Sequence, residues 1–177
     1  MMTSPSEKKK TPRVPASGVI TFDPEACNGC ESCELVCSLA HEGSSSQASS
    51  RITIHYSLEG EAACDVCQQC RQPSCLYVCP VEAILIHKGS GARYIDERIC
   101  IGCNQCYDAC PFTPKQAMIK AYRGEERITF IKCDLCKDQK EGPMCVKYCP
   151  TEALTFLPAE SRKRLSKGDE SKKTTGG

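Results

Sequence analysis

Seventeen cysteines in four runs limit what this chain of 177 residues can fold into. They make up about one residue in ten, far above ordinary usage. Because the hydrophobic fraction of 40% includes them and tryptophan is absent, an ordinary apolar core would be thin. Disulfides, zinc or iron–sulfur clusters must therefore organise the interior. The runs are Cys27, Cys30, Cys33 and Cys37; Cys64, Cys67, Cys70, Cys75 and Cys79; Cys100, Cys103, Cys106 and Cys110; and Cys133, Cys136, Cys145 and Cys149.

The runs repeat along the chain. The step from Cys67 to Cys100 and the step from Cys100 to Cys133 are both 33 residues. Three runs end in a Cys-Pro pair: Cys79-Pro80, Cys110-Pro111 and Cys149-Pro150. This periodicity indicates one supersecondary unit that is used four times.

The first and third runs read C-x2-C-x2-C-x3-C, which is the run found in bacterial ferredoxins. Three thiolates within seven residues can surround three corners of one cubane, and the fourth, at the start of a helical turn, can reach a neighbouring cluster. Zinc is the alternative, because C-x2-C pairs also build zinc ribbons. The third cysteine and the x3-Cys-Pro ending, however, suit an isolated tetrahedral site poorly.

The second run has two possible registers. Cys64, Cys67 and Cys70 form C-x2-C-x2-C by themselves, whereas the other register uses Cys67, Cys70, Cys75 and Cys79. We favour the second, because it keeps the x3-Cys-Pro ending and leaves sixteen ligands, four for each of four [4Fe-4S] clusters. Cys64 is then a non-ligand, a small buried apolar side chain.

The fourth run is interrupted between Cys136 and Cys145 by eight residues that include Gly142-Pro143. A turn-rich insert of this kind can loop out while its flanks close on a metal. Spacing alone supports the ligand role of these cysteines more weakly than it does in the first and third runs.

Charge and hydropathy exclude several classes of protein. With 23 Lys and Arg against 22 Asp and Glu, the chain lacks the field of a nucleic-acid binder. No apolar run approaches the roughly 20 residues that cross a bilayer, and residues 1–19 do not resemble a signal peptide. We expect a cytoplasmic protein, unless it is exported with a partner, and in that reducing compartment thiols favour metals over disulfides.

The pattern between the runs predicts an α+β fold with short elements. We expect a helix over Glu31–His41, with Leu35 and Leu39 on one stripe, hairpin turns at 88–91 and 123–125, and unstructured charged segments at 1–17 and 159–177. The expected strands are Val19–Phe22, Ile52–Tyr56, Ala83–His87, Arg93–Asp96, Met118–Tyr122, Ile128–Lys132 and Ala153–Leu157.

Over residues 19–157, the four motifs resemble the four-cluster ferredoxin-like subunits of molybdenum, tungsten, nickel and hydrogenase-type redox enzymes. The segment CNGCESCELVCSLAHEG at 27–43, followed by Ser-Arg-Ile at 50–52, resembles the small electron-transfer subunit that accompanies tungsten-containing aldehyde oxidoreductases and class II benzoyl-CoA reductases. Unlike membrane-linked relatives, this chain shows no hydrophobic anchor, which argues against quinone reduction.

The resemblance implies one domain, 18–158, made of two nested ferredoxin-like modules: 18–57 with 124–158, and the inserted 58–123. It also implies four ligand sets, which keep these names below. The first set is Cys27, Cys30, Cys33 and Cys149; the second is Cys37, Cys133, Cys136 and Cys145; the third is Cys67, Cys70, Cys75 and Cys110; the fourth is Cys79, Cys100, Cys103 and Cys106.

Four complete ligand sets leave little chain for a substrate site, so we expect an electron-transfer subunit with no catalytic residues of its own. His41, His55 and His87 are scattered, and we expect His41 at the surface. The resemblance implies a large tungstopterin aldehyde oxidoreductase-like partner, with a flavin-containing subunit or soluble ferredoxin as the other carrier, and no nucleic acid or membrane span. Alternatives are an iron–sulfur subunit of benzoyl-CoA reductase, carbon monoxide dehydrogenase, hydrogenase or formate dehydrogenase, a free soluble ferredoxin, or a zinc-binding structural module.

Overall fold

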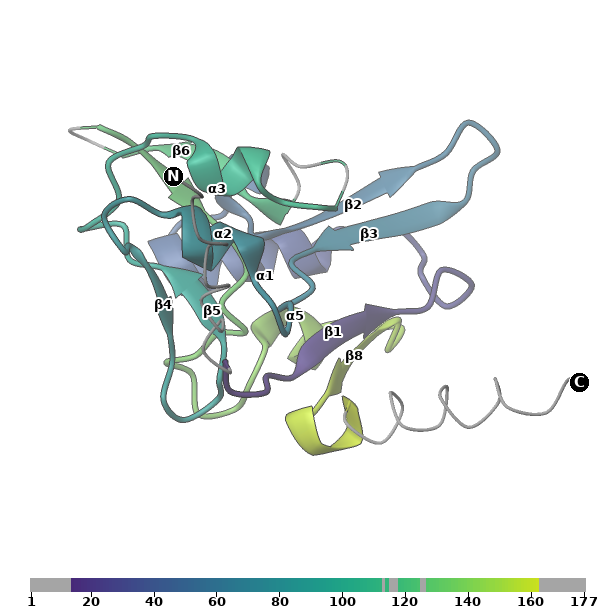
Figure 1. The fold of residues 1–177 in the computed structure, drawn as a ribbon. Helices are drawn as coiled ribbons and strands as arrows, with labels where there is room; N and C mark the ends of the chain where they lie inside the picture. Colours follow the sequence, from purple (N-terminus) through teal and green to yellow (C-terminus); the bar gives the residue numbers. More distant parts are fainter. Residues whose placement is uncertain (1–13, 113, 115–117, 125–126, 163–177) are drawn as a thin grey trace, which may run out of the picture.

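The structure is a computed structural model that describes residues 14–112, 114, 118–124 and 127–162 (Figure 1). The elements, in chain order, are β1 (Val19–Phe22), α1 (Ser32–Glu42), the 3-10 turn η1 (Gln47–Ser49), β2 (Ile52–Tyr56), β3 (Ala62–Val66), α2 (Ser74–Val78), β4 (Ile84–Ile86), β5 (Arg93–Ile95), α3 (Gln105–Asp108), β6 (Lys120–Arg123), β7 (Ile128–Ile131), α5 (Met144–Lys147) and β8 (Leu154–Leu157). The mixture of short helices and strands confirms the predicted α+β class. Within the described residues, no helix is long and apolar enough to span a membrane.

The strands pair two by two and antiparallel: β1 with β8, β2 with β3, β4 with β5, and β6 with β7. Each of the seven predicted strands is present within two residues of its expected bounds. The predicted turn at 88–91 closes a hairpin, since the N–H of Gly91 donates to the carbonyl of His87 at 2.8 Å. Of the predicted turn at 123–125, residue 125 lies outside the described residues, and the N–H of Gly124 donates to the carbonyl of Arg127 at 3.1 Å. Strand β3 was not predicted, because its residues belong to the second cysteine run.

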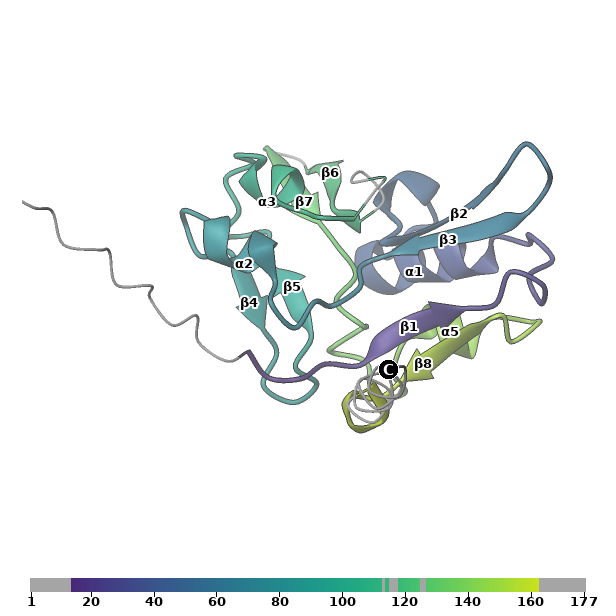
Figure 2. The same cartoon turned by 45° about the vertical axis from the view of Figure 1, so that its right-hand side comes forward.

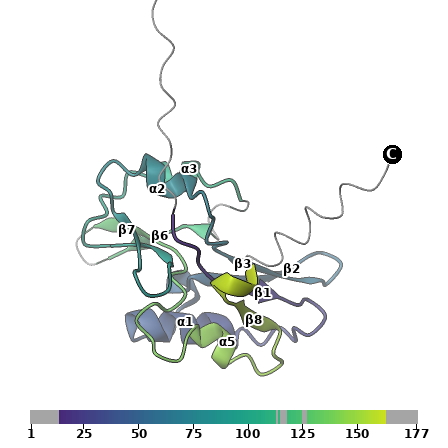
Figure 3. The ribbon, with the colours of Figure 1, turned by 60° about the horizontal axis from the view of Figure 1, so that its bottom comes forward.

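The elements gather in two halves, which Figure 2 separates clearly. One half holds α2, α3 and β4 to β7, and the other holds α1, α5, β1, β8 and the long β2–β3 hairpin. The pairing of Val19 with Leu157 joins the two ends of the described core, and α1 lies beside α5 (Figure 3). Cysteines of the first and fourth runs therefore come together in one half.

Each half has its own core, and cysteines belong to both. One core contains Ile20, Ile52, Ile54 and Leu154 with buried cysteines of the first and second sets. The other contains Ile84, Ile95, Met118, Ile119 and Phe130 with cysteines of the third and fourth sets. Two hairpins cross the predicted module boundaries, because β3 pairs with β2 and β7 pairs with β6.

Helix α1 buries a different stripe from the one that its leucines suggest. It begins after Glu31, whose backbone is left-handed (φ 56°), and ends at Gly43, whose N–H donates to the carbonyl of Leu39 at 3.0 Å. Leu35 and Leu39 do share a stripe, but they are 44% and 52% exposed. The buried stripe is Cys33, Glu34, Cys37 and Ser38. The helix therefore turns thiols, not leucines, toward the core.

The two terminal segments that we expected to be unstructured are held in place where the structure describes them. Arg93 donates to the carbonyl of Pro15 at 2.7 Å, and Arg162 donates to the carbonyl of Gln69 at 3.0 Å. Residues of 14–17 and 159–162 therefore contact the folded part. The rest of those segments, 1–13 and 163–177, lies outside the described residues.

Candidate metal centres

Three cavities are each lined by four cysteines. The first set lines one of them, the third set another, and the fourth set the last. Apart from these sulfurs, the walls are mostly carbon, for example Ile84, Ile95 and Phe130 around the fourth set. Each cavity thus presents four thiols of the chain to one common space.

The four cysteines of the second set are all buried. Helix α1 contributes Cys37, α5 contributes Cys145, and the loop after β7 contributes Cys133 and Cys136. Burial, together with the charges of Cys37 and Cys136, raises the pKa of Cys145 well above its ordinary value. The thiols of this set are therefore near enough to repel one another as thiolates.

Cys64 lies on β3 opposite Ile54, away from the third set. The cavity of that set includes Cys75 in its lining and does not include Cys64. Burial first, and then the charges of Cys33, Asp65 and Cys27, raise the pKa of Cys64. The charge of Cys64 also acts on Cys145, so its neighbours include cysteines of the first and second sets.

The donor chemistry of the cavities fits a soft metal centre. All 17 cysteines are described, and all are free thiols. Burial raises the pKa of Cys33 and of Cys106 to about 12, so these thiols are protonated without a metal. Thiolates are the ligands that iron–sulfur clusters and zinc prefer, and a metal that binds here must displace protons.

The backbone of all four runs shares one conformational feature, a residue with positive φ beside a cysteine. Each run has a left-handed residue directly before one of its cysteines: Gly29 (φ 72°) before Cys30, Gln69 (φ 48°) before Cys70, Gly102 (φ 70°) before Cys103 and Leu135 (φ 60°) before Cys136. Glycine adopts this conformation freely, but for glutamine and leucine it is uncommon and is typical of functional sites. The repeat in spacing is therefore also a repeat in conformation.

Backbone N–H groups point at cysteine sulfurs. The N–H of Arg51 lies 3.3 Å from Sγ of Cys37, and that of Ala83 lies 3.2 Å from Sγ of Cys79. Hydrogen bonds of this kind stabilise a thiolate, and around metal centres they tune the redox potential.

A buried charged network lies beside the second set. Asp134 accepts a hydrogen bond from Nε2 of His41 at 2.9 Å and forms an ion pair with Arg51 at 3.4 Å. Burial alone would raise the pKa of Asp134, but the bond from His41 and the charges of His41 and Arg51 lower it to about 2. The side chain of His41 is only 11% exposed, so the expectation of a surface histidine was wrong. The residues next to His41 in the sequence do not indicate this burial, because its partner Asp134 lies far away along the chain.

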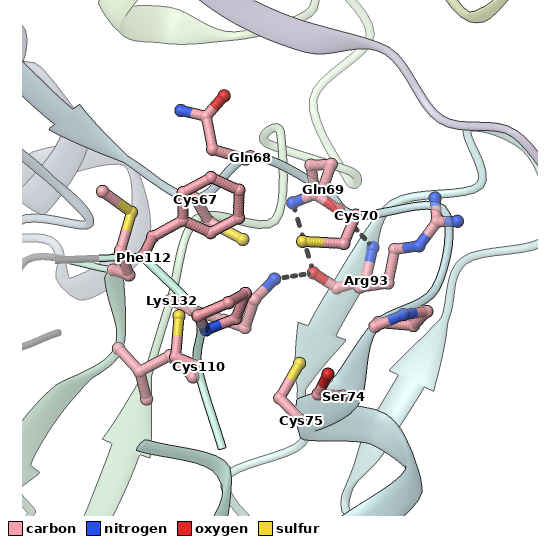
Figure 4. A pocket seen from close by; sticks show the side chains of 14 residues that line it. Cys67, Gln68, Gln69, Cys70, Ser74, Cys75, Arg93, Cys110, Phe112 and Lys132 are labelled. Carbon is pink, nitrogen blue, oxygen red and sulfur yellow. Dashed lines mark hydrogen bonds between the residues drawn. The ribbon is translucent and has the colours of Figure 1, made fainter. Parts of the chain in front are cut away.

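A second residue without a predicted role is Lys132, which is 3% exposed and lines the cavity of the third set (Figure 4). Burial favours the neutral amine, but the charges of Cys67, Cys75 and Cys133 outweigh it and raise the pKa of Lys132. The sequence does contain a signal for this role, because Lys132 is a charged residue between Ile131 and Cys133 at the end of an otherwise apolar strand.

A ferredoxin-like arrangement of cysteine runs around thiol-lined cavities is typical of an iron–sulfur protein of the electron-transport class. The model of the family described as "4Fe-4S dicluster domain" matches residues 58–158. The chain therefore belongs to this family. This confirms the predicted iron–sulfur, ferredoxin-like character and favours [4Fe-4S] clusters over zinc.

Known proteins with related sequences support this conclusion. The putative electron transport protein YsaA of Escherichia coli K12 is 34% identical over 152 residues, which cover 82% of this chain and 92% of the relative. Formate hydrogenlyase subunit 2 of the same organism is 32% identical over 176 residues, covering 84% and 85%. Among solved structures, a chain of the active site complex BamBC of benzoyl coenzyme A reductase with benzoyl-CoA aligns with a TM-score of 0.46 and 23% identity, over 90% of this chain and 92% of that one.

Proposed function

We propose that this chain is an electron-relay subunit that holds four [4Fe-4S] clusters, one on each of the four ligand sets, and has no catalytic residues of its own. The clusters supply one-electron chemistry when bound. The observation that supports the proposal is that the first, third and fourth sets each line a separate cavity with four thiols, while all four cysteines of the second set are buried.

Exchange of cysteines between runs would fix the distances between clusters. Cys33 and Cys37 lie one turn apart on α1, which is about 6 Å along the helix axis, yet they belong to the first and second sets. Cys145 and Cys149 are likewise four residues apart and belong to the second and first sets. Neighbouring clusters are then tied to the same short backbone segments, so electron transfer between them does not depend on a flexible linker.

Contacts between segments that lie far apart in the sequence support two nested modules. The pairing of β1 with β8 and the contact of α1 with α5 bring the first and fourth runs together. The third and fourth sets share the other core. We therefore propose that 18–57 with 124–158 form one ferredoxin-like module around the first and second sets, and that 58–123 form the inserted module. Strand β3 of the inserted segment then pairs with β2 of the outer module, and β7 of the outer segment pairs with β6 of the inserted module.

The proposed partner is a large catalytic redox subunit of the tungstopterin aldehyde oxidoreductase type, with a flavin-containing subunit or a soluble ferredoxin as the second carrier. The segment at 27–43 and its resemblance to the small subunits of such enzymes support this choice. A relative is named as subunit 2 of formate hydrogenlyase, which supports a place in a larger complex. Seventeen free thiols favour a reducing compartment, the cytoplasm.

Anaerobic purification of the native protein from its source tests the partner. We expect the chain to copurify with a large polypeptide in fixed ratio, and we expect elemental analysis of the complex to find tungsten. Molybdenum or nickel in place of tungsten would contradict the tungstopterin assignment and leave the relay role standing. A brown chain that purifies alone would contradict the subunit role and favour the free ferredoxin.

A further inference from the structure

The cavity of the third set contains a buried cation. Lys132 follows β7, and its ammonium group reaches into the space that Cys67, Cys70 and Cys75 surround (Figure 4). The residue is 3% exposed, so water screens its charge little.

Neutral carbonyl groups hold the ammonium in place. It donates to the carbonyl of Arg93 and, at 3.0 Å, to the carbonyl of Cys133. Gln69 braces the same two groups, because its Nε2 lies 2.7 Å from the Cys133 oxygen and 3.3 Å from the Arg93 oxygen. Among the described residues, no ion pair joins Lys132 to a carboxylate. Its nearest opposite charges are the cysteine thiolates.

Two further cations surround the same set. Arg93 is buried and lines the cavity, and the charges of Cys67 and Cys70 act on both Arg93 and Arg162. No Asp or Glu lines this cavity among the described residues. The third set therefore lies in a positive environment.

The first and second sets lie in different environments. Glu31 lines the cavity of the first set, and the charge of buried Glu34 acts on Cys33. The charge of Asp134 acts on the second set. The two cations that pair with Asp134, His41 and Arg51, lie at this set too, so its buried charges offset one another. The fourth set has no charged side chain in its lining among the described residues. The four sets are thus electrostatically unequal.

We propose that Lys132 is a tuning residue whose buried charge raises the reduction potential of the cluster on the third set above the potentials of the other three. The inference rests on the proposed function. Reduction adds one electron to the cluster, which goes from a 2+ to a 1+ core, and no bond forms or breaks. A fixed cation stabilises the more negative, reduced state, and burial strengthens that effect. The cluster on the third set would then be the first of the four to be reduced.

The test is a potentiometric titration of the anaerobically purified full chain. Dithionite supplies the electrons through redox mediators, and electron paramagnetic resonance (EPR) follows each cluster. Lys132→Gln removes the charge but keeps a hydrogen-bond donor for the two carbonyls, and Lys132→Arg keeps the charge. Lys140→Met, at an exposed position, is the matched control.

We expect Lys132→Gln to shift the highest of the four potentials downward, with the other three and the iron content unchanged. Lys132→Arg and Lys140→Met should keep the wild-type order. Unchanged potentials in Lys132→Gln at full iron content would overturn the inference and leave the proposed function intact, as would an equal shift of all four. Loss of the third cluster in Lys132→Gln would also overturn it, because Lys132 would then be structural. A wild-type chain without iron would instead overturn the proposed function.

Discussion

Cys75→Ser is expected to remove about a quarter of the iron, roughly four atoms per chain, because one [4Fe-4S] cluster loses a ligand. Cys75 lines the same cavity as Cys67, Cys70 and Cys110, and a serine oxygen is a harder and poorer ligand for iron–sulfur clusters than a thiolate. Cys64→Ser is the matched control, since Cys64 lies on β3 opposite Ile54. It should keep the full iron content.

Elemental analysis and EPR spin quantification of both variants, purified anaerobically, measure this difference. Circular dichroism shows whether each variant keeps the wild-type secondary structure. The opposite result, with iron lost in Cys64→Ser and retained in Cys75→Ser, would establish the other register of the second run. Full iron in both variants would remove Cys75 from the ligands and contradict the third set.

Asp134→Ala is expected to be the most destabilising of the substitutions away from the cysteines, at about 3–5 kcal/mol, because removing one partner leaves a buried charge without compensation. Asp134 accepts from His41 at 2.9 Å and from the N–H of Cys136 at 3.0 Å, and it pairs with Arg51. The pKa of His41 is raised to about 10, in spite of burial, by its bonds to Asp134 and Cys37. In the variant, His41 would lose the carboxylate that stabilises its charge, and Arg51 would keep only its ion pairs with Glu42 and Glu97.

Anaerobic unfolding in guanidinium, followed through the visible absorbance of the clusters, measures the loss. Asp138→Ala is the control, because the Asp138 side chain is 74% exposed, and a surface substitution of this kind changes stability by about 0.5 kcal/mol or less. Asp134→Asn should fall between the two variants. Equal midpoints for Asp134→Ala and Asp138→Ala would show that the buried network does not stabilise the fold.

Local patterns in the sequence predicted the parts of the fold that depend on local chemistry. Alternating apolar residues such as Val19–Phe22 and Ile52–Tyr56 became strands with those bounds. Strand β3 was missed because Ala62–Val66 contains Cys64 and Asp65, which break the apolar alternation and read as part of a metal-binding run. It forms because β2 offers it a complete antiparallel partner, and that is a tertiary effect.

The grouping of the thiols into four sets came from the family resemblance and not from the spacing, because Cys149, for example, lies far along the chain from the other members of the first set. Neither the spacing nor the resemblance predicted which charged side chains would be buried. Lys132 and His41 are buried because the carbonyl of Arg93 and the carboxylate of Asp134, both far away in the sequence, receive their hydrogen bonds. No local pattern encodes such partners, and they are the residues that distinguish one set electrostatically from another.

Metal analysis of the anaerobically purified chain tests the central claim most directly, together with EPR after reduction with dithionite. The account predicts a brown protein with about sixteen iron atoms per chain, no stoichiometric zinc, and paramagnetic signals that integrate to about four spins when reduction is complete. A folded, colourless protein with about four zinc atoms and no signal after dithionite would contradict it.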